Sequence, residues 1–254
     1  SLQGLALALP TPLDKAAATA LPLRLHSGPI DNTAAAQDRL ALDLGTPASP
    51  LLALRFERDV SGPAARVLRG VIQVGAVGPS SGPGPGPATL PASGVVAQLS
   101  LPALDVDAWD SWLARSGQSG AVGTPVAQGY WPSQVSLSVD RLVVAQRTLH
   151  QLRAQARREG NTWRAQVAAD ELAGRIDYRS AQGPGAGQVF ARLSHLKLER
   201  SAAGNVDQLL RQQPTSVPAL DVVVERLELG SRELGRLALD AVNRNTEGGN
   251  EWRL

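Results

Sequence analysis

The sequence contains no cysteine and no methionine, and among its 254 residues only two are phenylalanine and two tyrosine. The absence of cysteine excludes disulfide bonds, cysteine-ligated zinc, iron–sulfur clusters and thiol nucleophiles within the chain. It leaves the compartment open, because oxidising compartments permit disulfides without requiring them. Since the chain starts at Ser1 and has no methionine, we expect it to be an internal piece of a longer protein.

Long apolar runs and charge of one sign are also missing. No run approaches the roughly 18 apolar residues that a membrane-spanning helix needs, and no signal peptide opens the sequence. The 25 basic side chains include two lysines, so 23 arginines face 23 acidic residues, and the net charge is +2. The densest basic run, Arg153, Arg157 and Arg158, has no aromatic neighbours on which bases could stack. These features argue against nucleic acid as a partner.

No constellation of reactive side chains stands out. His26, His150 and His195 are each isolated, without partners at metal-ligand spacing. Ser194 and Lys197 match the Ser-x-x-Lys pattern of penicillin-recognising acylases, but they lie in an alternating strand pattern that would point them to opposite faces. We therefore predict no metal, no cofactor and no enzymatic activity.

An internal repeat is the clearest positive signal. Residues 135–156 return 85 positions later as residues 220–241, and a Trp-Arg pair follows each copy. The identical positions are spread along both copies: Val139, Arg141, Leu142, Arg147, Leu149, Leu152 and Ala156 recur as Val224, Arg226, Leu227, Arg232, Leu234, Leu237 and Ala241.

Each copy of the repeat is predicted to be a β-hairpin, because its apolar residues alternate with a period of two. The alternation slips by one residue at Arg141 and again at Arg226, which indicates a β-bulge that returns the apolar residues to the same face. Turns are predicted at residues 145–147 and 230–232, followed by return strands that end near Ala156 and Ala241.

Other strands are predicted from the same alternation, and short helices at two places. One helix follows the capping residue Asp105 and carries Trp109 and Trp112; the other covers residues 206–211. The predicted strands are 21–25, 40–44, 51–57, 67–74, 95–101, 163–169, 174–179 and 188–199.

The Gly- and Pro-rich residues 78–94 interrupt any helix or strand. We therefore divide the chain into an N-terminal β segment (1–77), a linker or loop (78–94) and a repeat-built β segment (95–254).

Three stretches resemble the YhdP family of AsmA-like bacterial envelope proteins: LPTPLDKAAATALPLRL near the start, LPASGVVAQLSLPALDVDAWDSWL in the middle, and WRAQVAADELAGRIDYR after the first hairpin. The closing PALDVVVERLELGSRELGRLALDA is the most specific part of the resemblance. The resemblance implies a periplasmic protein, anchored to the inner membrane by a helix absent from this piece. It also implies a curved β-sheet whose apolar groove carries phospholipids between the inner and outer membranes.

The expected fold is mostly β: an elongated, curved antiparallel meander that forms an apolar groove, with few helices. A two-sheet sandwich core would give the same sequence pattern. Candidate groove-lining residues all lie on the predicted apolar face of the repeat-built segment: Val135, Leu137, Val139, Leu142, Val144, Leu152, Val167, Ile176, Val222, Val224, Leu227 and Leu237.

These features predict contact with phospholipid acyl chains, and possible partners among outer-membrane or other envelope proteins. The alternative function is a structural or assembly scaffold of the envelope that binds partner proteins by sheet-edge pairing.

Overall fold

The computed structural model describes residues 1–6, 8–11, 13–30, 36–46, 49–75, 89–116, 129–181, 187–198, 219–246 and 249–253. The chain divides into two compact units, Ser1–Leu152 and Arg153–Leu254. Most of the predicted linker and the predicted helix at 206–211 lie outside the described residues.

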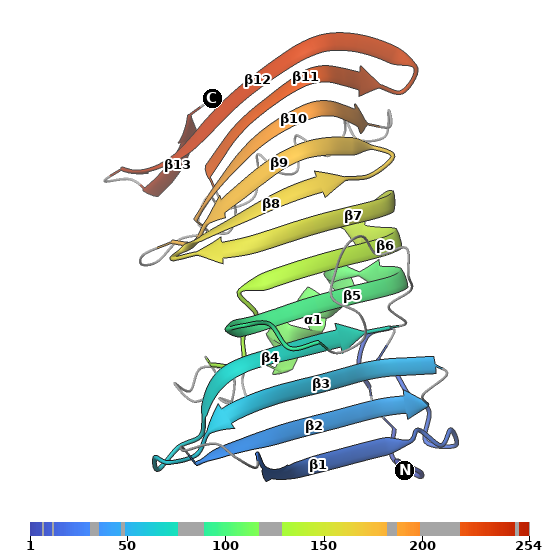
Figure 1. The fold of residues 1–254 in the computed structure, drawn as a ribbon. Helices are drawn as coiled ribbons and strands as arrows, with labels where there is room; N and C mark the ends of the chain where they lie inside the picture. Colours follow the sequence, from blue (N-terminus) through green and yellow to red (C-terminus); the bar gives the residue numbers. More distant parts are fainter. Residues whose placement is uncertain are drawn as a thin grey trace. The chain divides into compact units, whose positions relative to one another are not determined.

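Over its described residues the first unit is a sheet in which strands β1 to β6 lie side by side in chain order, with helix α1 between β5 and β6 in sequence (Figure 1). All five strands predicted before residue 102 are present, each longer than expected. The elements are β1 (Leu23–Pro29), β2 (Gln37–Thr46), β3 (Ser49–Asp59), β4 (Arg66–Val74), β5 (Gly94–Asp105), α1 (Val106–Ser116) and β6 (Gln134–Val144).

The second unit continues the same pattern. It takes in most of strand β7 (Arg147–Glu159) and all later strands, again in chain order. These are β8 (Thr162–Ala168), β9 (Leu172–Arg179), β10 (Gln188–Leu198), β11 (Ala219–Leu229), β12 (Arg232–Thr246) and β13 (Gly249–Arg253).

The expected antiparallel meander is wrong at three pairs of strands. Strands β4 and β5, β5 and β6, and β10 and β11 pair in parallel. A parallel pair needs a connection of about a dozen residues or more, and each of these pairs is joined by a long one: 75–93, 106–133 and 199–218. The other pairs are antiparallel, so the sheets are mixed but largely antiparallel.

The predicted bulge is confirmed in the second hairpin. Val224 lies opposite Leu237 and Leu227 opposite Gly235, so strand β11 carries one extra residue across Glu225 and Arg226. A second, unpredicted bulge follows on β12, where Leu227 and Glu228 lie opposite Gly235 and Glu233. The two bulges compensate each other, and Leu229 again faces a partner at the turn.

Two-residue turns close both hairpins. Ala145 and Gln146 connect β6 to β7 with positive φ angles of 50° and 58°, a conformation typical of tight hairpin turns. The carboxylate of Asp107 in α1 accepts hydrogen bonds from both turn amides, at 2.8 and 2.7 Å. Helix α1 thereby holds the end of this hairpin.

The predicted cap and tryptophan pair of helix α1 are both present. Asp105 accepts a hydrogen bond from the backbone amide of Ala108 at 2.9 Å, which satisfies one of the free amides of the first turn. Trp109 and Trp112 pack edge to face, with ring centroids 5.8 Å apart. Trp109 also donates a hydrogen bond to the carbonyl of Thr11, so the helix contacts the N-terminal segment.

Each unit is a single layer of strands over its described residues. Strands there make extensive contacts with their sheet neighbours only, and α1 packs against β6. No second sheet lies on the first among these residues, so the sandwich alternative finds no support in this part of the chain.

Gly70 provides a test of the packing in the first unit. A Cβ atom at this position would lie 2.3 Å from the Phe56 ring on the neighbouring strand. We expect Gly70→Ala to lower the free energy of unfolding by about 2 kcal/mol, because the ring has to leave its site. In a Phe56→Leu background the same substitution should cost much less. Equal costs in both backgrounds, measured by denaturant unfolding, would contradict this packing.

Candidate functional site

One face of the second unit is built from continuous rows of apolar side chains. Residues directly opposite each other on neighbouring strands share a face, so the pairing register defines these rows. We call this side of the sheet, in either unit, the apolar face. Two rows cross β7 to β12: Ala156, Ala165, Ile176, Ala191, Val222 and Leu239, and beside it Ala154, Val167, Gly174, Leu193, Val224 and Leu237.

The apolar face is tightly packed at its centre and open towards β12. Ala191, Leu193 and Val224 form a buried cluster, and Val224 is completely inaccessible to solvent. Leu227 packs against this cluster although two residues separate it from Val224, so the bulge keeps both on one face. Leu237, in the same row as Val224, is 36% exposed.

The first unit repeats this arrangement. Its rows cross β1 to β6: Leu25, Leu42, Leu54, Ile72, Ala97 and Val135, and beside it Leu23, Leu44, Leu52, Val74, Leu99 and Leu137. Most of these side chains are half-buried. The apolar face here is therefore aliphatic and partly open to solvent.

The predicted groove-lining residues occupy these rows or extend them. Val139, 1% exposed, lies opposite Leu101, and Leu142 lies opposite Leu104. Leu42 and Leu44 of β2 and Leu52 and Leu54 of β3 also stand in these rows but were not among the predicted lining residues, although the same alternation runs through both strands. Val135, Leu137, Val144, Val167, Ile176 and Val222 are half-buried, whereas Leu142 and Leu152 are buried.

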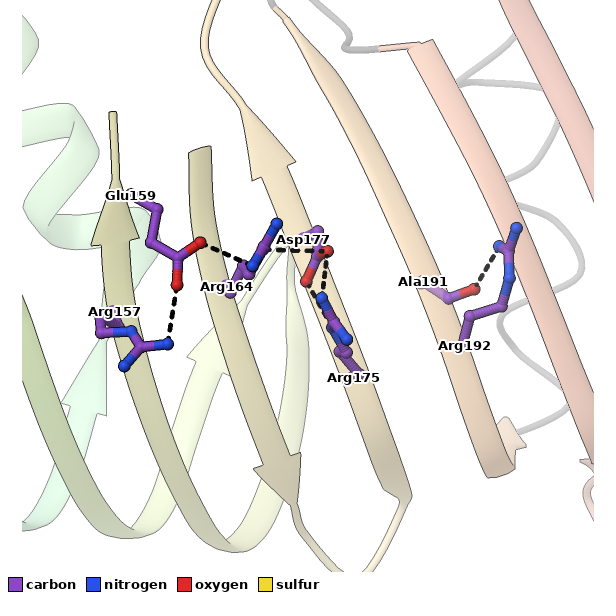
Figure 2. Close-up of polar contacts among 7 residues, drawn as sticks. All are labelled: Arg157, Glu159, Arg164, Arg175, Asp177, Ala191 and Arg192. Carbon is purple, nitrogen blue, oxygen red and sulfur yellow. Dashed lines mark hydrogen bonds and ion pairs between the residues drawn. The ribbon is translucent and has the colours of Figure 1, made fainter. Parts of the chain in front are cut away.

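The opposite face of the second unit carries a network of charges, which Figure 2 shows. Glu159 accepts from Arg157 at 2.7 Å and from Arg164 at 2.6 Å, and Asp177 pairs with Arg175 at 2.9 Å. Further along, Arg192 pairs with Asp221 at 2.8 Å, and this hydrogen bond lowers the pKa of Asp221. We call this side of either unit the charged face.

The charged face of the first unit centres on Glu57. Its side chain is 6% exposed and pairs with Arg39 at 2.8 Å and with Arg69 at 2.6 Å. Burial raises the pKa of Glu57, but the hydrogen bonds from the two arginines outweigh it and hold the pKa below its usual value. Gln73 donates a buried hydrogen bond to Gln98 at 3.0 Å on the same face.

The described ranges contain neither a cluster of metal-ligating side chains nor a helix that could span a membrane. There, no three His, Asp or Glu residues gather where they could hold a metal ion. No helix in that part of the chain is long and apolar enough to cross a membrane.

Comparison with known proteins gives one match. The model of a family described as YhdP protein matches residues 1–254, the whole chain. Neither the curated proteins nor the solved structures contain a match.

The lowered pKa of Glu57 predicts how the stability of the first unit depends on pH. Because its pKa is lowered by folding, the unfolded chain takes up the proton first; the stabilisation is complete above about pH 4.5 and is lost as pH falls through the lower folded value. We expect Glu57→Gln to cost about 1 kcal/mol at pH 7 and to flatten the decline in stability below pH 5. Exposed Asp110, changed to Asn, is the control. Identical pH profiles of unfolding for Glu57→Gln and the parent would refute this role.

Proposed function

Since this chain belongs to the YhdP family, we propose that it is a periplasmic segment of a bridge-like lipid transfer protein. In this proposal its apolar face lines a groove that carries phospholipid acyl chains between the inner and outer membranes. The observation that supports it most is the set of uncharged, largely aliphatic rows across single-layer sheets whose opposite face is charged.

Acyl chains suit this surface for energetic reasons. Each methylene group that leaves water contributes about 0.8 kcal/mol, so even partial burial of a long chain favours capture. The rows are made of Ala, Val, Leu and Ile with one glycine, Gly174, and no charged side chain stands among the paired residues at their centre. A surface of uniform chemistry lets a bound chain slide, because no position holds it much more tightly than the next.

The direction of the rows also fits the proposed lipid path. They cross the strands, so they extend along the direction in which the sheet adds strands. A sequence that repeats every 85 residues lengthens the rows without changing their chemistry. The proposed path therefore grows with each copy of the repeat.

A scaffold function in the envelope is the second candidate, and strand β1 favours it. Within the described chain β1 pairs only with β2, and its Leu25 is 65% exposed. An exposed edge strand can accept a strand from a partner protein. In that function the apolar face would carry no lipid.

The remaining parts of the proposal concern the full-length protein. It would be anchored in the inner membrane and would have contact with outer-membrane or other envelope proteins. Nucleic acid, metal ions, cofactors and catalysis have no place in it.

Val222 and Val223 offer a matched test. They are neighbours in β11, both half-buried, and they point to the apolar and the charged face respectively. With a photo-crosslinking amino acid at either position of the full-length protein in cells, we expect phospholipid adducts at Val222 and few or none at Val223. The readout is mass spectrometry of the crosslinked protein. Absence of lipid at both positions, with the protein folded, would favour the scaffold.

A further inference from the structure

Two arginines occupy equivalent places beside the hairpin turns. Arg147 and Arg232 are 85 residues apart, and each is the first residue of the return strand after a two-residue turn. This position is identical in both copies of the repeat although the turn residues differ, Ala145 and Gln146 in one and Gly230 and Ser231 in the other.

Arg232 lies at the end of the apolar face. Its cross-strand partner is Leu229, which in turn pairs with Leu198 on β10. Leu229 follows Leu227 on the apolar side of β11, so Arg232 stands where that face meets the rim of the sheet. Its side chain is exposed.

Arg147 holds the matching position in the first unit. The two-residue turn makes Val144 and Arg147 the pair of residues that flank it. Val144 follows Leu142 on the apolar side of β6, and Leu142 lies opposite Leu104. Each unit therefore has an arginine where the turn of its repeat hairpin meets the apolar face.

Arg147 and Arg232 lie on the apolar side of the sheet, apart from the ion-paired arginines of the charged face. Arg39, Arg69, Arg164, Arg175 and Arg192 are each bound to a carboxylate at 2.6–2.9 Å. The side chains of Arg147 and Arg232 make no ion pair or hydrogen bond with any residue that the structure describes. Asp107 of helix α1, which contacts the first hairpin turn, accepts hydrogen bonds from the turn amides.

An amphipathic anion has a charged end and an apolar end. A guanidinium group at the edge of an aliphatic surface can bind the charged end while the surface contacts the apolar end. Its planar fork binds phosphate oxygens in pairs, and its hydrocarbon stem lies along apolar surface. We propose that Arg147 and Arg232 bind the phosphate of a lipid headgroup whose acyl chains lie on the apolar face. This inference rests on the proposed function and adds a headgroup contact to it.

The phosphate group could come from a lipid or from free phosphate, and the position of the arginines favours the lipid. A site for free phosphate gains nothing from Leu198 and Leu229 beside it, whereas a lipid contacts both the charge and the leucines. Two such positions, one in each copy of the repeat, would each hold a headgroup at the turn end of the apolar face in its own unit.

The test compares two fluorescent lipids with identical acyl chains, phosphatidylglycerol and diacylglycerol, bound to the purified full-length protein. We expect the double variant Arg147→Gln/Arg232→Gln to bind phosphatidylglycerol about five-fold more weakly and diacylglycerol as the parent does. Arg147→Lys/Arg232→Lys should recover part of the loss, because lysine keeps the charge but not the paired hydrogen bonds.

The control is Arg24→Gln/Arg153→Gln. It removes one exposed arginine of the charged face from each unit, and neither of these arginines has a carboxylate partner within the described ranges. It should bind both lipids as the parent does, and circular dichroism should show all variants folded.

Three outcomes would overturn the inference. If the rim variant and the parent bind both lipids equally, the headgroup contact is wrong while the lipid groove stands. If the parent binds neither lipid, the proposed function itself fails. If millimolar inorganic phosphate displaces the fluorescent phosphatidylglycerol from the protein as effectively as unlabelled phosphatidylglycerol does, the arginines form a site for free phosphate.

Discussion

Strand register is the constraint on which the rest of this structure depends. In a single-layer sheet a shift of one residue moves every side chain of a strand to the other face. Here such a shift would place leucines among the arginine–carboxylate pairs. In β11 the apolar side chains on one face are three residues apart at the phase slip, from Val224 to Leu227. Strand β10 makes the same three-residue step beside it, from Leu193 to Leu196, so the two strands stay in register. The bulge on β12 then restores the register before the turn.

The charged face contributes in a different way. Surface ion pairs stabilise a fold only modestly, so pairs such as Arg192 with Asp221 add little to the stability of the sheet. Their larger effect is on which surfaces can pack against this face of the sheet. In the second unit, where the Arg192 side chain is 53% exposed, such a face does not pack against another sheet, because its charges would lose water without gaining better partners. An apolar ligand of that unit is therefore expected on its apolar face.

The sequence predicted what depends on local pattern. The alternation of Val135 to Val139 and of Val222 to Leu227, the cap at Asp105 and the bulge at Arg226 are all signals within a few residues. The parallel pairs were missed because the composition of a long connection does not say at which end of the sheet it returns. The pairing of Glu57 with Arg39 and Arg69 depends on register between three strands, which no local pattern contains. The curvature of the expected groove stays a prediction.

The three parallel pairs also separate fast from slow steps in folding. A hairpin such as β11–β12 closes a loop of two residues and forms on the microsecond timescale. Pairing β10 with β11 requires the ends of a 20-residue connection, residues 199–218, to meet first, at a larger cost in chain entropy. High contact order is thus confined to the parallel boundaries, and the antiparallel blocks β1–β4, β6–β10 and β11–β13 fold from local contacts, whereas β5 pairs in parallel on both sides. During synthesis each block can form as it leaves the ribosome and then join its predecessor along a single strand.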